Sequence, residues 1–176
     1  MLGTMRQITE RDRKNLTAAL ERSGLRATRQ REQVFGVLVS QRDHPTAEEV
    51  FARARKQLST ISLATVYNCL ETLVECDLIK KLNYEREPSR YCPNHGEHAH
   101  FLDEATGRVF DIDIPKDFHE TLTTILPKGF AANKIKLSFS GRVEPEAAER
   151  QSNSSASTVW EHIDQPNNQT KQNRSR

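Results

Sequence analysis

Cysteine and long apolar runs are scarce in this chain. Its 176 residues include three cysteines, an odd number without disulfide-like spacing, which excludes a disulfide-stapled secreted domain and predicts a reducing compartment. No stretch approaches the roughly 20 apolar residues that a membrane helix requires, and residues 1–7 contain no apolar core of a signal peptide. We therefore expect a cytoplasmic protein without a membrane segment.

The hydrophobic share, 35% of the residues, is also low for a fully compact protein and predicts that part of the chain lacks packed structure. The length allows one mid-sized domain or two small ones. From Glu144 the sequence is rich in Ser, Asn, Gln and Glu. We predict a disordered tail over residues 144–176.

Four amphipathic helices are predicted in the first half. Apolar residues recur at helical spacing over 12–23 and again after Thr28, Thr46 and Ser62, three residues suited to N-cap positions. The segment 46–49 has the pattern of a capping box. A strand at 78–82, a polar loop and a returning strand at 89–91 follow. This layout is typical of a winged helix-turn-helix domain, expected over residues 1–90, with a helical domain without a wing as the alternative.

Strand-like patterns dominate the next segment. We predict strands at 98–101, 108–114 and 134–139, and one short helix that carries Phe118, Leu122 and Ile125. A small α+β unit of this kind, assigned to residues 91–143, has an exposed sheet edge and would gain stability by dimerising. The predicted fold class is therefore α+β, with a winged-helix domain followed by a small dimerisation domain.

A cluster of metal-binding residue types lies where the two predicted domains meet. Cys92, His98 and His100 fall within nine residues, and thiolate and imidazole are preferred ligands of zinc and similar divalent metals. On an extended strand, His98 and His100 would lie on one face. Asp111 could return on the neighbouring strand of a hairpin and add an oxygen ligand. The alternative is a buried cysteine beside two surface histidines.

The first half also has features of a DNA-binding protein. The second helix of a helix-turn-helix pair reads the major groove with its N-terminal residues, and here that stretch combines small and hydrogen-bonding side chains, including an Asn suited to pairing with adenine. Basic residues before it and in the hairpin would contact phosphate. An ordinary amphipathic helix and a solvated basic face are the alternative. The predicted DNA contacts are Arg26, Arg29, Arg31, Ala64, Thr65, Tyr67, Asn68, Lys80, Lys81 and Arg86.

Three segments, 25–31, 44–51 and 63–70, closely resemble the Fur family of metal-responsive bacterial transcriptional repressors. The resemblance runs from about Leu16 to Val143 and is most specific over Ala64-Thr65-Val66-Tyr67. It implies an N-terminal winged helix, a C-terminal dimerisation domain and a metal site at their junction. Family members typically bind A·T-rich palindromic DNA as dimers.

The resemblance also implies a set of ligands. The family's sensing histidine before the third helix falls on His44, its His-x-His pair on His98 and His100, and its later acid on Asp111. A further ligand falls on Cys92, as in the zinc-sensing branch. Tetrahedral zinc needs four ligands, one fewer than this set, and His95 and Glu97 are nearby alternates.

Two family features have no counterpart here. The cysteine pairs that hold a structural zinc are missing, because Asp103 and Thr106 occupy the first pair and no cysteine follows Cys92. A second sensing site lacks its ligands, with Ala99 and Ile135 at the matching positions. We read Cys69 and Cys76 as core residues.

The sequence thus predicts a dimeric repressor that binds operator DNA when Zn²⁺ occupies the junction. Alternatives within the family are sensing of Fe²⁺, Mn²⁺ or haem, and oxidation of Cys92. A zinc hydrolase is a further alternative, although the sequence has no His-Glu-x-x-His segment, nucleophile elbow or phosphate loop. The last is metal-independent DNA binding, with the cluster as a relic. We do not expect an enzyme.

Overall fold

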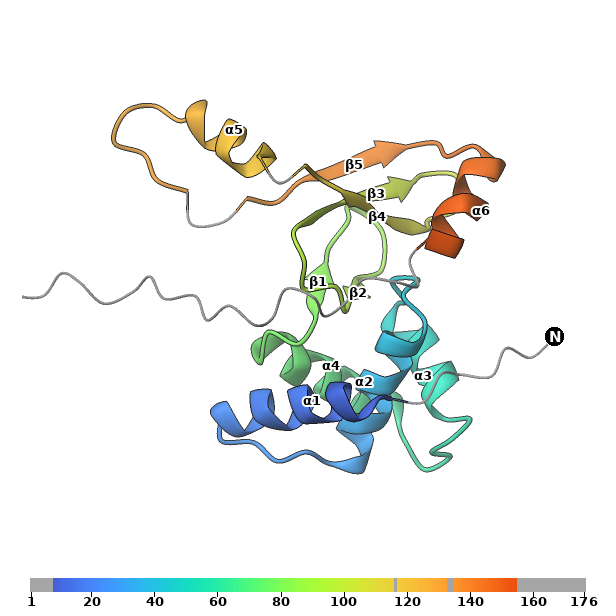
Figure 1. Ribbon diagram of the computed structural model, residues 1–176. Helices are drawn as coiled ribbons and strands as arrows, with labels where there is room; N and C mark the ends of the chain where they lie inside the picture. Colours follow the sequence, from blue (N-terminus) through green and yellow to red (C-terminus); the bar gives the residue numbers. More distant parts are fainter. Residues whose placement is uncertain (1–7, 116, 133–134, 155–176) are drawn as a thin grey trace, which may run out of the picture.

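The computed structural model describes residues 8–115, 117–132 and 135–154. A helical half and a half built around a three-stranded sheet lie one above the other, joined by a two-stranded hairpin (Figure 1). None of the helices in the described ranges has the length and apolar character needed to cross a membrane.

The helical half consists, over residues 8–75, of α1 (Glu10–Arg22), α2 (Arg29–Ser40), α3 (Ala47–Ala54) and α4 (Leu63–Glu75). Thr28, Thr46 and Ser62 accept backbone hydrogen bonds as N-caps, as predicted. Helix α1 begins two residues earlier than expected, because Thr9 and Asp12 form a capping box. The buried core of this half is formed mainly by Leu16, Leu20, Val34, Phe35, Leu38, Val50, Val66, Leu70 and Leu73.

The wing follows α4 directly. Strand β1 (Lys80–Leu82) pairs antiparallel with β2 (Arg90–Cys92). The predicted first strand began at 78, but Leu78 and Ile79 instead pack into the helical core. Arg90 also bridges to Thr46, at the start of α3. The wing is therefore hydrogen-bonded to the segment that carries His44.

The second half has a sheet with strand order β4-β3-β5. Strand β3 (His98–Asp103) pairs antiparallel with β4 (Val109–Asp113) and parallel with β5 (Ser138–Gly141), and α5 (Phe118–Thr124) lies in the connection to β5. The strand predicted at 134–139 begins only at Ser138, although the Leu137 carbonyl accepts from the His100 amide. The α+β fold class with an N-terminal winged helix is confirmed.

The predicted tail is not irregular at its start. Helix α6 spans Pro145–Ser154, so the prediction of disorder is wrong for those residues. Proline suits the first position of a helix, and Ala147 and Ala148 have high helix propensity. Both alanine amides donate to the Glu144 carbonyl. Residues 155–176 lie outside the described part of the chain.

Candidate metal centre

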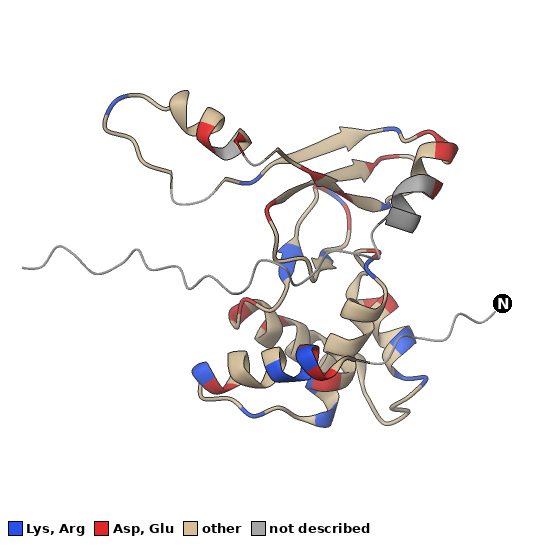
Figure 2. Cartoon of the chain, in the orientation of Figure 1, with Lys and Arg blue, Asp and Glu red and all other residues tan. Residues whose placement is uncertain are grey.

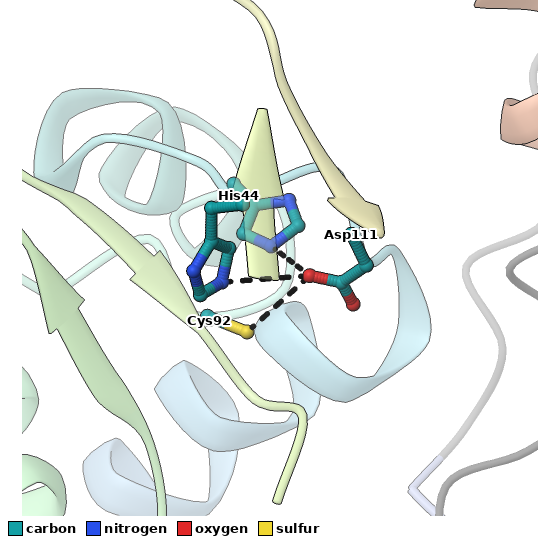
Figure 3. Close-up of side chains that lie close together, drawn as sticks. His44, Cys92 and Asp111 are labelled. Atoms are coloured by element: carbon teal, nitrogen blue, oxygen red, sulfur yellow. Dashed lines mark hydrogen bonds and ion pairs between the residues drawn. The ribbon is translucent and has the colours of Figure 1, made fainter. Parts of the chain in front are cut away.

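Four separate segments bring the predicted ligands together. His44 lies in the loop before α3, Cys92 at the end of β2, His98 and His100 on β3, and Asp111 on β4. His100 and Asp111 are direct partners in the β3–β4 register, as the expected hairpin requires. Figure 3 shows His44 and Cys92 pointing toward the Asp111 carboxylate.

The distances between donor atoms fit a small ion. Asp111 Oδ1 lies 2.8 Å from His44 Nε2, 3.3 Å from His98 Nε2 and 3.5 Å from His100 Nε2. Cys92 Sγ lies 3.5 Å from His98 Nε2 and 3.9 Å from Asp111 Oδ1. Ligands of tetrahedral zinc, each 2.0–2.3 Å from the metal, lie roughly 3.3–3.6 Å from one another. Small adjustments of side chains would therefore suffice to hold an ion.

His44 is the contribution of the helical half. Its side chain is 2% exposed, and its backbone has φ of +52°, a left-handed conformation that is uncommon for residues other than glycine. Arg90 donates a hydrogen bond to the His44 carbonyl, and the Tyr91 amide donates to the Pro45 carbonyl. The wing therefore holds the loop in the conformation that directs His44 toward the second half.

Neighbouring groups orient the other ligands. His98 Nδ1 lies 2.7 Å from the Gly96 carbonyl, which leaves its Nε2 facing the centre. Asn94 donates from its side chain to Asp111 Oδ2 at 2.9 Å and from its backbone to Cys92 Sγ at 3.4 Å. Such outer contacts fix ligand geometry in metal sites. The roles of Asn94 and Arg90 were not predicted from the sequence, in which the position of Asn94 two residues after Cys92 is the one signal.

Burial favours the neutral forms of His98 and His100. It lowers the pKa of His100 to about 3, helped by His98 and His44 nearby, and it lowers the pKa of His98 against the opposing effect of Asp111. Neutral imidazole is the form that binds metal.

The pKa values of the two acidic ligands, Cys92 and Asp111, shift in opposite directions. Burial and the nearby Asp111 charge raise the pKa of the Cys92 thiol to about 12. Burial alone would raise the pKa of Asp111 as well, but hydrogen bonds from His44 and Asn94 and the nearby histidines hold it below its usual range. A cation entering the site would meet one carboxylate and would displace the thiol proton.

The residues fit a divalent cation with a preference for nitrogen and sulfur. Ligand atoms of His44, Cys92, His100 and Asp111 all lie within 4.8 Å of one another, and His98 adjoins three of them. In the described ranges, the alternates His95 and Glu97 do not belong to this group. Thiolate and imidazole together suit zinc, whereas Mn²⁺ prefers oxygen.

The predicted DNA contacts are spread over the helical half and the wing. On α4, Ala64, Tyr67 and Asn68 are exposed, Thr65 is half-buried, and Val66 faces the core. Basic and acidic residues alternate over this half rather than forming one continuous stripe (Figure 2).

Four of the predicted basic contacts have partners within the chain, including Arg86, whose Nε lies 3.9 Å from Glu85 Oε1. Lys81 pairs with Glu71 at 2.7 Å, and the Lys80 ammonium donates to the Gly96 carbonyl beside the metal-binding cluster. Arg31 donates to the Arg26 carbonyl. Arg26, Arg29 and Arg86 have exposed side chains.

Two further groups of residues have structural roles: the cysteines outside the metal centre, and the residues that replace the family's first cysteine pair. Cys69 and Cys76 are buried in the helical core, as predicted. Asp103 is buried and accepts hydrogen bonds from the Thr106 hydroxyl and the Ala105 and Val143 amides. A carboxylate thus ties the β3–β4 turn to the chain that leaves β5.

Comparisons with known proteins agree with this architecture. The peroxide-responsive repressor PerR of Staphylococcus epidermidis is 33% identical over 99 residues, which cover 56% of this chain and 66% of that protein. Among solved structures, a zinc-bound manganese uptake regulator is 26% identical with a TM-score of 0.58 and covers 74% of this chain and 99% of that one. The Campylobacter jejuni peroxide stress regulator is 27% identical with a TM-score of 0.59, over 73% and 96% of the two chains.

The family model of the ferric uptake regulators matches residues 22–140. That range extends from the end of α1 to β5 and includes every residue of the candidate metal centre. Since it covers more than half of the sequence, the chain belongs to the ferric uptake regulator family.

Proposed function

We propose that this protein is a metal-responsive transcriptional repressor that binds operator DNA as a dimer when a divalent cation occupies the junction site. The observation that carries the proposal is the convergence of His44, from the helical half, with ligands of the second half. A ligand set drawn from two domains couples metal binding to their relative orientation.

The coupling follows from differential affinity. A cation bound by donors on both sides favours the arrangement in which those donors converge, and a ligand shifts an equilibrium only by that difference in affinity. In a dimer, the orientation of each helical half sets the separation of the two α4 helices. That separation must match the spacing of DNA half-sites.

Zinc is the cation that the donor set supports best. Cys92 supplies a soft ligand beside three imidazoles, and borderline-soft Zn²⁺ accepts both. The names of the relatives leave other signals as alternatives, since one is a zinc-bound manganese uptake regulator and two respond to peroxide. Mn²⁺, Fe²⁺ and haem are therefore second candidates. Sensing of peroxide through Cys92 is disfavoured, because thiolate is the reactive form and burial raises the pKa of this thiol.

A zinc hydrolase is a weaker alternative. Catalytic zinc sites have three protein ligands and keep a position open for water. Here the junction offers five donors, counting His98, which is enough to surround a zinc ion without water. The winged helix would also have no role in hydrolysis.

Dimerisation is expected through the second half. Strand β5 lies at one edge of the sheet, and Phe139 on it is 44% exposed. Exposed edges and apolar side chains of this kind are suited to pairing with a second copy. The cytoplasmic location expected from the sequence is part of the same proposal.

The proposal is tested by comparing the DNA affinity of the metal-free protein with that of the metal-loaded protein. A random-sequence duplex library is selected with the protein in excess Zn²⁺, and the enriched duplex is titrated by fluorescence anisotropy with EDTA, Zn²⁺ or Mn²⁺. We expect tight binding with Zn²⁺ and loss of binding with EDTA. Equal affinity under all three conditions would contradict metal-responsive repression.

A further inference from the structure

The Tyr67 side chain is held by an acidic residue on the neighbouring helix. Its hydroxyl donates a hydrogen bond to Oε1 of Glu48 over 2.7 Å, while the residue remains 40% exposed. Tyr67 lies on α4, the helix predicted to read DNA, and Glu48 lies on α3, the first helix of the pair. The bond therefore joins the two helices on their exposed side.

Glu48 is fixed in position as an ionised acceptor. The hydrogen bond from Tyr67 lowers the pKa of its carboxyl, as do its own backbone amide and the Thr46 hydroxyl. It is also the second residue of α3, where the positive end of the helix dipole favours a carboxylate. At neutral pH the hydroxyl of Tyr67 thus faces a charged, well-placed acceptor.

This arrangement limits what Tyr67 can do on DNA. A phenol has one proton to donate, and phosphate oxygens only accept, so a tyrosine binds phosphate by donating that proton. While the Tyr67 hydroxyl donates its proton in the hydrogen bond to Glu48, the phenol can offer DNA only its oxygen lone pairs and its ring. In the major groove these suit the amino groups of adenine and cytosine and the methyl group of thymine.

We propose that Glu48 is a positioning residue that sets DNA specificity, because it withholds the Tyr67 proton from phosphate and directs the phenol to base edges. The inference rests on the proposed function, since it requires α4 to enter the groove. Contacts to phosphate position a protein without specifying sequence, whereas contacts to bases discriminate. Glu48 would therefore suppress binding to random DNA more than it strengthens binding to the operator.

The experiment compares two duplexes: the one enriched by wild-type protein in excess Zn²⁺ and a scrambled duplex of the same composition. Affinities are measured at one salt concentration for wild type, Glu48→Ala, Glu48→Gln and the double variant Glu48→Ala/Tyr67→Phe. Glu75→Gln, at the far end of α4, removes an acidic charge elsewhere and serves as the control. Circular dichroism melts check that each variant is folded.

We expect Glu48→Ala to bind the scrambled duplex roughly tenfold more tightly, the size expected for a new hydrogen bond to a charged group. Glu48→Gln should retain most of the wild-type specificity, because its carbonyl still accepts from Tyr67. Adding Tyr67→Phe to Glu48→Ala should restore weak binding to the scrambled duplex, because the freed donor is gone.

Two outcomes overturn the inference alone while wild type still selects a duplex. In the first, adding Tyr67→Phe fails to reverse the tighter binding of Glu48→Ala to the scrambled duplex. In the second, Glu48→Gln or the Glu75→Gln control binds the scrambled duplex as tightly as Glu48→Ala does, which would assign the effect to charge. If wild-type protein with Zn²⁺ or Mn²⁺ enriches no duplex, the proposed function fails and this inference fails with it.

Discussion

Nε2 of His44 lies 2.8 Å from Oδ1 of Asp111, although 67 positions separate the two residues in the chain. The contact links the loop before α3 to strand β4, and thus the helical half to the sheet. It exists between two residues that are both candidate ligands. The two halves are therefore already in contact at the atoms where a cation would bind.

The Cys92 thiol is expected to be essential for zinc binding. Cys92→Ser replaces the soft ligand by a poor one, so zinc affinity should fall at least tenfold, and the response of DNA binding to zinc should be lost while the fold is kept. Chelator competition and anisotropy measure the two effects. Cys76→Ser, which also removes one buried thiol, is the control. Unchanged zinc stoichiometry and affinity in Cys92→Ser would remove Cys92 from the site.

Substitution of His44 should separate metal binding from the response to it. His44→Asn keeps a residue that tolerates the left-handed backbone at +52°, but removes the imidazole of the helical half. Cys92, His98, His100 and Asp111 remain, so we expect zinc still to bind, more weakly, and to strengthen operator binding less than in the wild-type protein. If zinc still strengthens DNA binding to the wild-type extent, His44 does not couple the domains.

Zinc affinity should rise with pH between about 6.5 and 8. The Cys92 thiol, with its pKa raised to about 12, is protonated in the metal-free protein, and zinc must displace that proton. The pKa values of His98, His100 and Asp111 are lowered. These three groups therefore release no protons over this pH interval. Displacement of the Cys92 proton is therefore expected to raise zinc affinity about tenfold per pH unit.

Isothermal titration in two buffers of different ionisation enthalpy counts the released protons directly. Cys92→Ser should release close to none. A pH-independent affinity of the wild-type protein would show that the thiol is already ionised or does not bind the metal.

Tyr67 should affect DNA binding without affecting the metal. Tyr67→Ala removes an exposed side chain of α4 that is not one of the candidate ligands. Loss of a good base contact is worth about 1–3 kcal/mol, so operator affinity should fall roughly tenfold or more at unchanged zinc content. An unaltered preference for the enriched duplex over a scrambled one would contradict a reading role for Tyr67.

Asp103 should stabilise the second half in place of a structural metal. Asp103→Ala leaves the Thr106 hydroxyl and the Ala105 and Val143 amides without their acceptor, so we expect a lower Tm in EDTA, with Thr106→Val giving a smaller change. These hydrogen bonds, chiefly that from Thr106, lower the pKa of Asp103. The stabilisation is therefore present at neutral pH and is lost as the pH falls through the folded-state pKa. An unchanged Tm in Asp103→Ala would refute this role.

Local signals made much of the architecture predictable. Thr28, Thr46 and Ser62 mark three helix starts by their capping chemistry, and the two-residue spacing of His98 and His100 predicted one strand face. Asp111 was expected opposite that strand, and the register pairs it with His100.

The errors have physical causes. Leu78 and Ile79 have strand-like composition, but their burial against the helices decides their conformation. The tail was interpreted from its polar composition, whereas Pro145 and two alanines favour a helix locally. Asn94 and Arg90 could not be recognised from the sequence, because their roles depend on the carboxylate and carbonyl that the fold places beside them.

Strand β3 is hydrogen-bonded on both sides, to β4 and to β5. His98 and His100 therefore lie on the least deformable strand of the sheet, and their positions should change little when an ion leaves. Residues 93–97, which connect Cys92 to this strand, belong to no helix or strand. When an ion leaves, we expect this five-residue segment to change conformation. The helical half and the wing would then rotate together relative to the sheet.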